Sequence, residues 1–213
     1  MANNKKFTTK NVLTAKGTMS GFINLTTPST KFNPEGIYSA NLLLSKEDGE
    51  KLLAEIKAVQ KEQFKNYGQG TRLADITKCV PYTTVDPETG EVLNDPEERY
   101  VVKAQRKARI KDGRPQLTVQ IIGADTKPCP NVKAGEGTEA KFGLILKGYS
   151  VAGKTGVSVD LAVVQILKLV EYGGQSLSAF GITAEDGFTA DDAEPFTEAE
   201  AVAPLEDETE EDF

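Results

Sequence analysis

The most explicit chemical motif in the sequence is Gly148–Thr155, which matches the phosphate-binding loop pattern G-x-x-x-x-G-K-[ST]. In such a loop, a helix beginning at the Lys and Thr supplies the backbone amides that hold the phosphates. Here the residues after Thr155 read GVSVDLAVV, and this alternation with β-branched side chains predicts a strand. We therefore predict a hairpin turn at this position. A nucleotide hydrolase remains an alternative that the missing helix disfavours.

The residue types that most hydrolases and metalloenzymes need are absent or scarce. The chain of 213 residues contains no histidine, which excludes Ser-His-Asp and Cys-His nucleophile pairs and His-ligated zinc. Cys79 and Cys129 are too few for a structural zinc cluster and give no sign of a disulfide-rich scaffold. We expect a protein that is not an enzyme, binds no cofactor or metal and works in a reducing compartment.

The N-terminus is polar and leads into no apolar run long enough for a signal peptide or a membrane span. The sequence therefore predicts a cytoplasmic protein with no membrane contact.

The formal net charge of −7 averages two unlike segments. Residues 183–213 contain 13 acidic and no basic residues, which leaves 19 acidic residues against all 25 Lys and Arg in residues 1–182, a formal charge of +6. The acidic segment has few apolar residues with which to offset the entropy of ordering. We predict a folded domain over 1–182 and a disordered acidic C-terminal tail over 183–213.

Two interpretations of this tail stay open. An acidic terminus can serve only for solubility. Alternatively, the aromatic Phe213 beside Glu210, Glu211 and Asp212 suits capture in a basic, partly apolar pocket on a partner. A tethered polyanion would also compete with an external polyanion for the basic body.

Alternation in three predicted strands separates an apolar face from a cationic one. In residues 99–111 the apolar face contains one exception, Arg106, and the opposite face carries Lys103, Gln105, Lys107, Arg109 and Lys111. In residues 140–149 the inward residues are Ala140, Phe142, Leu144 and Leu146, and the outward ones include Lys141, Ile145, Lys147 and Tyr149. In the first stretch we expect Met19, Ile23 and Leu25 inward, and Lys16, Thr18, Ser20, Phe22 and Asn24 outward.

Cations interleaved with exposed aromatic rings suit single-stranded nucleic acid, because the cations neutralise phosphates while the rings stack on unpaired bases. A duplex reader would need a basic recognition helix, which the sequence does not offer. The predicted DNA-binding set is Lys16, Phe22, Lys103, Lys107, Arg109, Lys141, Lys147 and Tyr149. Two alternatives stay open: the cations form only a soluble outer face that guards strand edges, and either ring folds back onto the core.

The elements that must position these residues are mostly strands. We predict strands near 12–25, 36–44, 99–110, 138–149 and 156–170, with 116–122 as an antiparallel partner of 99–110. Ser45 begins a helix whose apolar residues recur until Gly68, and residues 71–98 form a long excursion with a small hairpin. This pattern favours a five-stranded antiparallel OB-type barrel with one inserted helix.

The sequence resembles the single-stranded DNA-binding proteins of lytic bacteriophages. The resemblance rests on Asn33–Tyr38 leading into a strand and a Lys/Glu helix, on the late strand ending at Tyr149, and on the acidic tail closing on Asp212 and Phe213. It implies an OB-fold whose helix follows the second strand. It also implies a homodimer and a role in phage replication, recombination and repair in the cytoplasm of an infected bacterium.

The same resemblance implies a tail that contacts the replicative DNA polymerase and the helicase-primase and competes with DNA for the cleft. It makes Tyr149 a base-stacking residue, Lys103 and Lys141 contacts to the DNA backbone, and Phe213 the terminal hook for partners. Glu35 and Gln105 depart from the family pattern. The alternative from another class is a protein-interaction adaptor that binds no nucleic acid.

Overall fold

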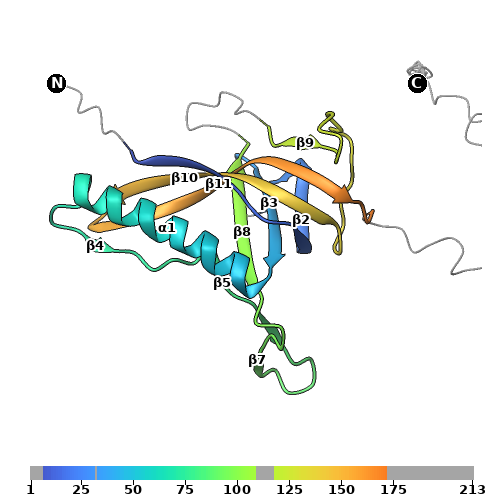
Figure 1. Ribbon diagram of the computed structural model, residues 1–213, viewed down its shortest axis with the longest axis horizontal. Coiled ribbons are helices and arrows are strands. Elements are labelled where there is room, and N and C mark those ends of the chain that lie inside the picture. The colour runs from blue at the N-terminus through green and yellow to red at the C-terminus, as the bar shows by residue number, and fades with distance from the viewer. Residues whose placement is uncertain (1–6, 32, 109–117, 172–213) are drawn as a thin grey trace, which may run out of the picture. The chain divides into compact units, whose positions relative to one another are not determined.

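Five strands of the chain close into a ring (Figure 1). The computed structural model describes residues 7–31, 33–108 and 118–171. In order around the ring, the strands are β2 (Gly17–Ser29), β3 (Ile37–Leu44), β8 (Tyr100–Lys107), β11 (Lys154–Lys168) and β10 (Glu139–Val151), and β10 pairs again with β2. The predicted five-stranded OB-type barrel is confirmed.

One strand pairing in the ring is parallel, whereas the prediction was of an antiparallel barrel. Four of the pairings around the ring are antiparallel, but β8 and β11 run parallel, with Gln105 opposite Asp160. A closed ring with an odd number of strands cannot alternate direction throughout, so one parallel pair is unavoidable.

Six shorter strands complete the strand list, and four of them extend the barrel sheet. They are β1 (Thr9–Leu13), β4 (Arg72–Leu73), β5 (Cys79–Pro81), β6 (Thr83–Val85), β7 (Val92–Asn94) and β9 (Gln120–Ile122). β1 pairs with β10, β5 with β8, and both β4 and β9 with β11. β6 and β7 pair with each other in a separate two-stranded sheet, which confirms the small hairpin expected within residues 71–98.

The predicted pairing of residues 116–122 with 99–110 is wrong. β9 instead runs parallel to β11, with Ile121 opposite Val164. β8 has no edge to offer it, because β3 pairs along one edge of β8 while β5 and β11 pair along the other. Val119 and Ile121 are buried in the core, so the apolar alternation predicted the burial of this segment but not its partner.

The single helix among the described residues, α1 (Lys46–Tyr67), follows the second strand of the barrel. The Ser45 hydroxyl accepts a hydrogen bond from the backbone N–H of Asp48 at 3.2 Å and caps the first turn. Leu52, Ile56 and Val59 are buried against the barrel. The predicted helix, its start and its place after the second strand are confirmed.

The core lies inside the ring and under α1. The inward residues of 99–108 and 140–146 are buried as alternation predicted, among them Val102, Ala104, Phe142 and Leu144. Ser20 was expected outward but is buried, and the regular alternation of β2 ends at this point, where Gly21 takes a φ of +66° and the register between β2 and β3 shifts. In the described part of the chain, no helix is both long and apolar enough to span a membrane.

Candidate nucleic-acid interface

A groove crosses the outer face of the barrel over β2, β3, β8 and β11. It consists of two hollows of about 330 and 380 Å³ that share Ile37 and Gln105. The first hollow is lined also by Lys78, Lys107, Lys147, Ser158, Val159 and Asp160. The second is lined also by Phe22, Asn24, Ser29, Lys31, Asn33 and Ser39. Four of the lining residues are lysines and Asp160 is the one acid among them, so the groove carries a net positive charge, while neutral polar and apolar side chains make up the rest.

Strand alternation places the cations of β8 on this face. Lys103, Gln105 and Lys107 are exposed, whereas Val102, Ala104 and Arg106, which alternate with them, are buried. Gln105 and Lys107 line the groove, whereas Lys103 lines neither hollow. The predicted separation of a core face from a cationic face is therefore confirmed for β8. The structure also brings Lys107 together with Lys147 of β10 in one hollow, although the two lysines are 40 positions apart in the sequence.

The buried Arg106 is explained by an acid that the sequence analysis had not singled out. Its Nε and Nη2 donate to the two carboxylate oxygens of Asp160 at 3.0 and 3.3 Å. The Nζ of Lys147 also donates to Asp160, at 2.6 Å. A guanidinium that is 8% exposed needs such a partner. Asp160 therefore fixes Arg106 and at the same time pairs with Lys147 in the first hollow.

Lys78 is a groove residue that the sequence analysis missed. It precedes β5 in an irregular segment with no alternation, so no pattern assigned it to a face. Its Nζ donates to Oε1 of Gln105 at 3.1 Å. Burial, and then the charge of neighbouring Lys103, lower the pKa of Lys78 below its ordinary value. A phosphate beside these two ammonium groups would relieve their repulsion.

The two aromatic residues of the predicted set differ in exposure. Phe22 is 86% exposed at the far end of the second hollow, so its ring does not fold back onto the core. Tyr149 is half-buried, lies two residues beyond Lys147 on the outward face of β10 and lines neither hollow. Its ring packs against Gly156 of β11, and a side chain at position 156 would collide with the Tyr149 hydroxyl.

Lys16 and Lys141 lie away from the groove. Lys16 forms an ion pair with Glu139 at the start of β10, at 3.2 Å. Lys141 faces outward near the same end of β10, opposite Gln165, and neither lysine lines either hollow. Arg109 and the tail residues Glu210, Glu211, Asp212 and Phe213 lie outside the described residues.

The phosphate-loop pattern forms a hairpin, as predicted. β10 continues to Val151, Ala152 and Gly153 turn with φ of 49° and 73°, and β11 begins at Lys154. The hydroxyl of Thr155 is within hydrogen-bond distance of the Ser150 and Thr71 hydroxyls, at 2.9 and 2.7 Å. No helix follows the turn, so the amide cradle of a phosphate loop does not form here.

Comparison with known proteins gives matches of structure only. No family model matches the sequence, and no curated protein does. The single-stranded DNA-binding protein gp2.5 of bacteriophage T7 is similar with a TM-score of 0.55 and 18% identity, over 85% of this chain and 99% of that chain.

The single-stranded DNA-binding protein of bacteriophage Enc34 is also similar. Its C-terminally truncated form gives a TM-score of 0.52 and 15% identity, over 76% of this chain and 87% of that one. Its complex with single-stranded DNA gives a TM-score of 0.51 and 15% identity, over 77% and 89%. This chain therefore has the OB-like fold of the phage single-stranded DNA-binding proteins.

Proposed function

We propose that this protein binds single-stranded DNA without sequence preference and acts in phage DNA replication, recombination and repair. The observation that carries the proposal is the groove, in which several lysines and an 86% exposed phenylalanine share one face of an OB-like barrel. In OB-folds the outer face of the second and third barrel strands, here β3 and β8, is the usual oligonucleotide surface. The likeness to a phage protein in complex with single-stranded DNA supports the same ligand.

In the proposed mechanism, lysines bind the phosphates of the strand and aromatic rings stack on its bases. Lys78, Lys103 and Lys107 neutralise successive phosphates, which explains why no base sequence is preferred. Phe22 in the second hollow and Tyr149 on the outward face of β10 each stack on a base. Lys16, Lys141 and Arg109 remain candidates for contacts to DNA that leaves the groove.

Asp160 limits the contribution of Lys147 to DNA binding. The Lys147 ammonium is paired with the Asp160 carboxylate at 2.6 Å, so a phosphate must compete with that carboxylate for it. The carboxylate is paired with both Arg106 and Lys147, so the exposed lysines of β8 are the cations open to phosphates. We infer that the strand lies with its bases toward the barrel and its phosphates toward the exposed lysines of β8.

The acidic tail is proposed to recruit the replicative DNA polymerase and the helicase-primase, with Phe213 and the acids Glu210, Glu211 and Asp212 as the contact. Its 13 acidic residues and its covalent link to the body give it a high effective concentration near the groove. The tail therefore competes with DNA until a partner or enough DNA displaces it. We also propose that the protein is a homodimer.

The proposal is tested by titrating a fluorescent single-stranded oligonucleotide with the full chain and with a version ending at Ile182, at low and moderate salt. We expect both proteins to bind, salt to weaken both, and the shortened protein to bind more tightly. Unlabelled double-stranded DNA should displace the labelled single strand only weakly. Failure of both proteins to bind at low salt would favour the interaction adaptor, and a loss of affinity on shortening would contradict competition by the tail.

A further inference from the structure

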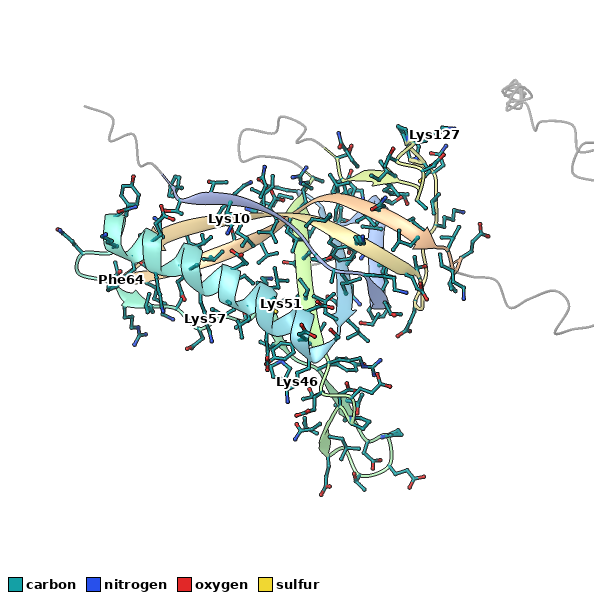
Figure 2. All side chains as sticks on the ribbon, in the orientation of Figure 1. Lys10, Lys46, Lys51, Lys57, Phe64 and Lys127 are labelled. Carbon is teal, nitrogen blue, oxygen red and sulfur yellow. The ribbon has the colours of Figure 1, made fainter. Side chains whose placement is uncertain are left out.

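The side chain of Gln63 joins α1 to β10. Gln63 is 1% exposed and directly precedes Phe64, which Figure 2 shows at the end of α1 opposite to Lys46. Its Oε1 accepts a hydrogen bond from the backbone N–H of Thr8 at 2.9 Å, and its Nε2 donates to the hydroxyl of Ser150 at 3.4 Å. Because both ends of this buried amide are bonded, the side chain is held in one orientation.

Gln63 holds the residues on both sides of Tyr149. Ser150 is bonded to it directly, and a Cβ at position 148 would lie only 2.7 Å from Cβ and Oε1 of Gln63. The backbone N–H of Gly148 also donates to the carbonyl oxygen of Thr8 at 2.8 Å. Gly148 and Ser150 therefore face α1, and strand alternation turns Tyr149 to the outward face of β10.

A chain of hydroxyl groups extends this anchor to the end of α1. The hydroxyl of Thr71 donates to the carbonyl oxygen of Gly68, the C-cap residue of α1, at 2.7 Å. Because each hydroxyl has a single proton, Thr155 donates to Thr71 at 2.7 Å, and Ser150 donates to Thr155 at 2.9 Å. Ser150 in turn accepts from Gln63. Two residues of the phosphate-loop pattern thus fix the β10–β11 hairpin to α1 (Figure 1).

Gly156 supplies the space that the Tyr149 ring occupies. The two residues lie directly opposite each other in the pairing of β10 with β11. A Cβ at position 156 would collide with the Tyr149 hydroxyl and would lie 2.5 Å from Cζ of the ring. Gly156 does not have a positive φ, so its backbone conformation would accept any residue. The ring of Tyr149 is therefore the reason that position 156 has no side chain.

We propose that Gln63 and Gly156 are positioning residues for Tyr149. Gln63 fixes the direction in which the ring leaves β10, and Gly156 lets the ring lie against β11. The ring is then oriented before a base arrives, which reduces the entropy that stacking would cost. Gln63 lies on the face of β10 opposite to the ring, so its effect on DNA binding passes through Tyr149. The inference rests on the proposed function, in which Tyr149 stacks on a base.

The first test needs no DNA. In the full chain with 13C-labelled tyrosine and glycine, NMR should show nuclear Overhauser contacts between the ring protons of Tyr149 and the Hα protons of Gly156. Gln63→Met, which keeps the length of the side chain but removes both hydrogen bonds, should weaken these contacts.

Thr138→Val is the matched control for this test. It removes a hydroxyl that is 0% exposed and bonded to the backbone of Val170, just before the opposite end of β10. The variant loses a buried polar group as Gln63→Met does, but it should keep the contacts between Tyr149 and Gly156.

The second test is the affinity for a short single-stranded oligonucleotide, measured where every variant is folded. Gly156→Ala and Gln63→Met should each weaken binding about fivefold or more, the lower end of the value of one base–aromatic stack. When Tyr149→Ala is already present, the same changes should alter affinity less than about twofold, because the ring that they position is gone. Thr138→Val should bind like the wild type.

Three results would overturn the proposal. They are unchanged ring contacts in Gln63→Met, unchanged affinity of both variants while the wild type binds, and equal losses with and without the Tyr149 ring, which would show that both changes act on other contacts to DNA. If Gln63→Met does not fold, Ser150→Ala replaces it in both tests. If the wild type does not bind the oligonucleotide, the proposed function fails, while the NMR contacts still decide whether Gln63 orients the ring.

Discussion

At the scale of single residues, Phe22 is the side chain whose position bears most directly on the proposed binding. A benzyl ring that is 86% exposed makes almost no contact with the rest of the protein, although its apolar area would ordinarily be buried. It stands directly after Gly21 and borders the second hollow of the groove. A base of single-stranded DNA would cover this ring, which gives its exposure a functional reason.

Phe22→Ala should therefore weaken binding of a single-stranded oligonucleotide by about 1–3 kcal/mol, the usual value of one base–aromatic stack. Its unfolding free energy should stay within about 0.5 kcal/mol of wild type, because so little of the ring is packed. Fluorescence titration and chemical denaturation measure the two effects. Leu13→Ala, at an exposed residue outside the groove, is the control. Tyr149→Ala should weaken binding similarly, and unchanged affinity would remove the residue concerned from the interface.

Asp160 should affect stability and binding in opposite directions. Asp160→Asn removes the charge that compensates the buried Arg106, so we expect the unfolding free energy to fall by about 3 kcal/mol. The same change frees Lys147 from its ion pair, so the folded variant should bind the oligonucleotide more tightly. Denaturation and titration of one sample test both effects. Weaker binding by a folded variant would show that Lys147 does not reach the strand.

At the scale of elements, the alternation of side chains predicted which face of a strand is buried but not which strands pair with each other. The apolar faces of 99–108 and 140–146 and the cationic face of β8 followed from a period of two residues. That period assigns each side chain to a face of the sheet but does not identify the neighbouring strand, so the partner of 116–122 was predicted wrongly. Lys78 was missed because it lies in an irregular segment, where position depends on tertiary packing alone.

The helix α1 is positioned by a close contact that sequence patterns do not reveal. Gly49 faces Tyr100 of β8 so closely that any side chain at position 49 would overlap the tyrosine. Helix propensity alone predicts that Gly49→Ala raises the unfolding free energy by about 1 kcal/mol. The close contact predicts the reverse, because overpacking should lower the unfolding free energy by about 1–3 kcal/mol.

Thermal denaturation of Gly49→Ala decides between these two signs. Ala58→Gly, on the exposed face of the same helix, should lose about 1 kcal/mol from propensity alone and serves as the reference. A melting temperature for Gly49→Ala above that of the wild type would show that α1 packs less closely on β8 than described.

At the scale of the whole molecule, charge is sorted by location. The lining of the groove contains four lysines and one acid, residues 82–98 contain six acidic and no basic residues, and residues 183–213 contain 13 acidic and no basic residues. The net charge of −7 conceals this sorting. A protein that binds one polyanion while tethering another can adjust its affinity through competition. The proposed function therefore requires that DNA binds in the groove.

The measurement that tests this most directly is oligonucleotide binding by the full chain with Lys103→Glu and Lys107→Glu combined. Both lysines are exposed, so folding should be unaffected, whereas four units of charge change on the outer face of β8. We expect at least about a hundredfold loss of affinity and a smaller dependence of affinity on salt. Lys127→Glu with Lys133→Glu makes the same change of net charge outside the groove and should lower affinity far less. Equal losses in the two double variants would contradict the account, since binding would then follow net charge and not the groove.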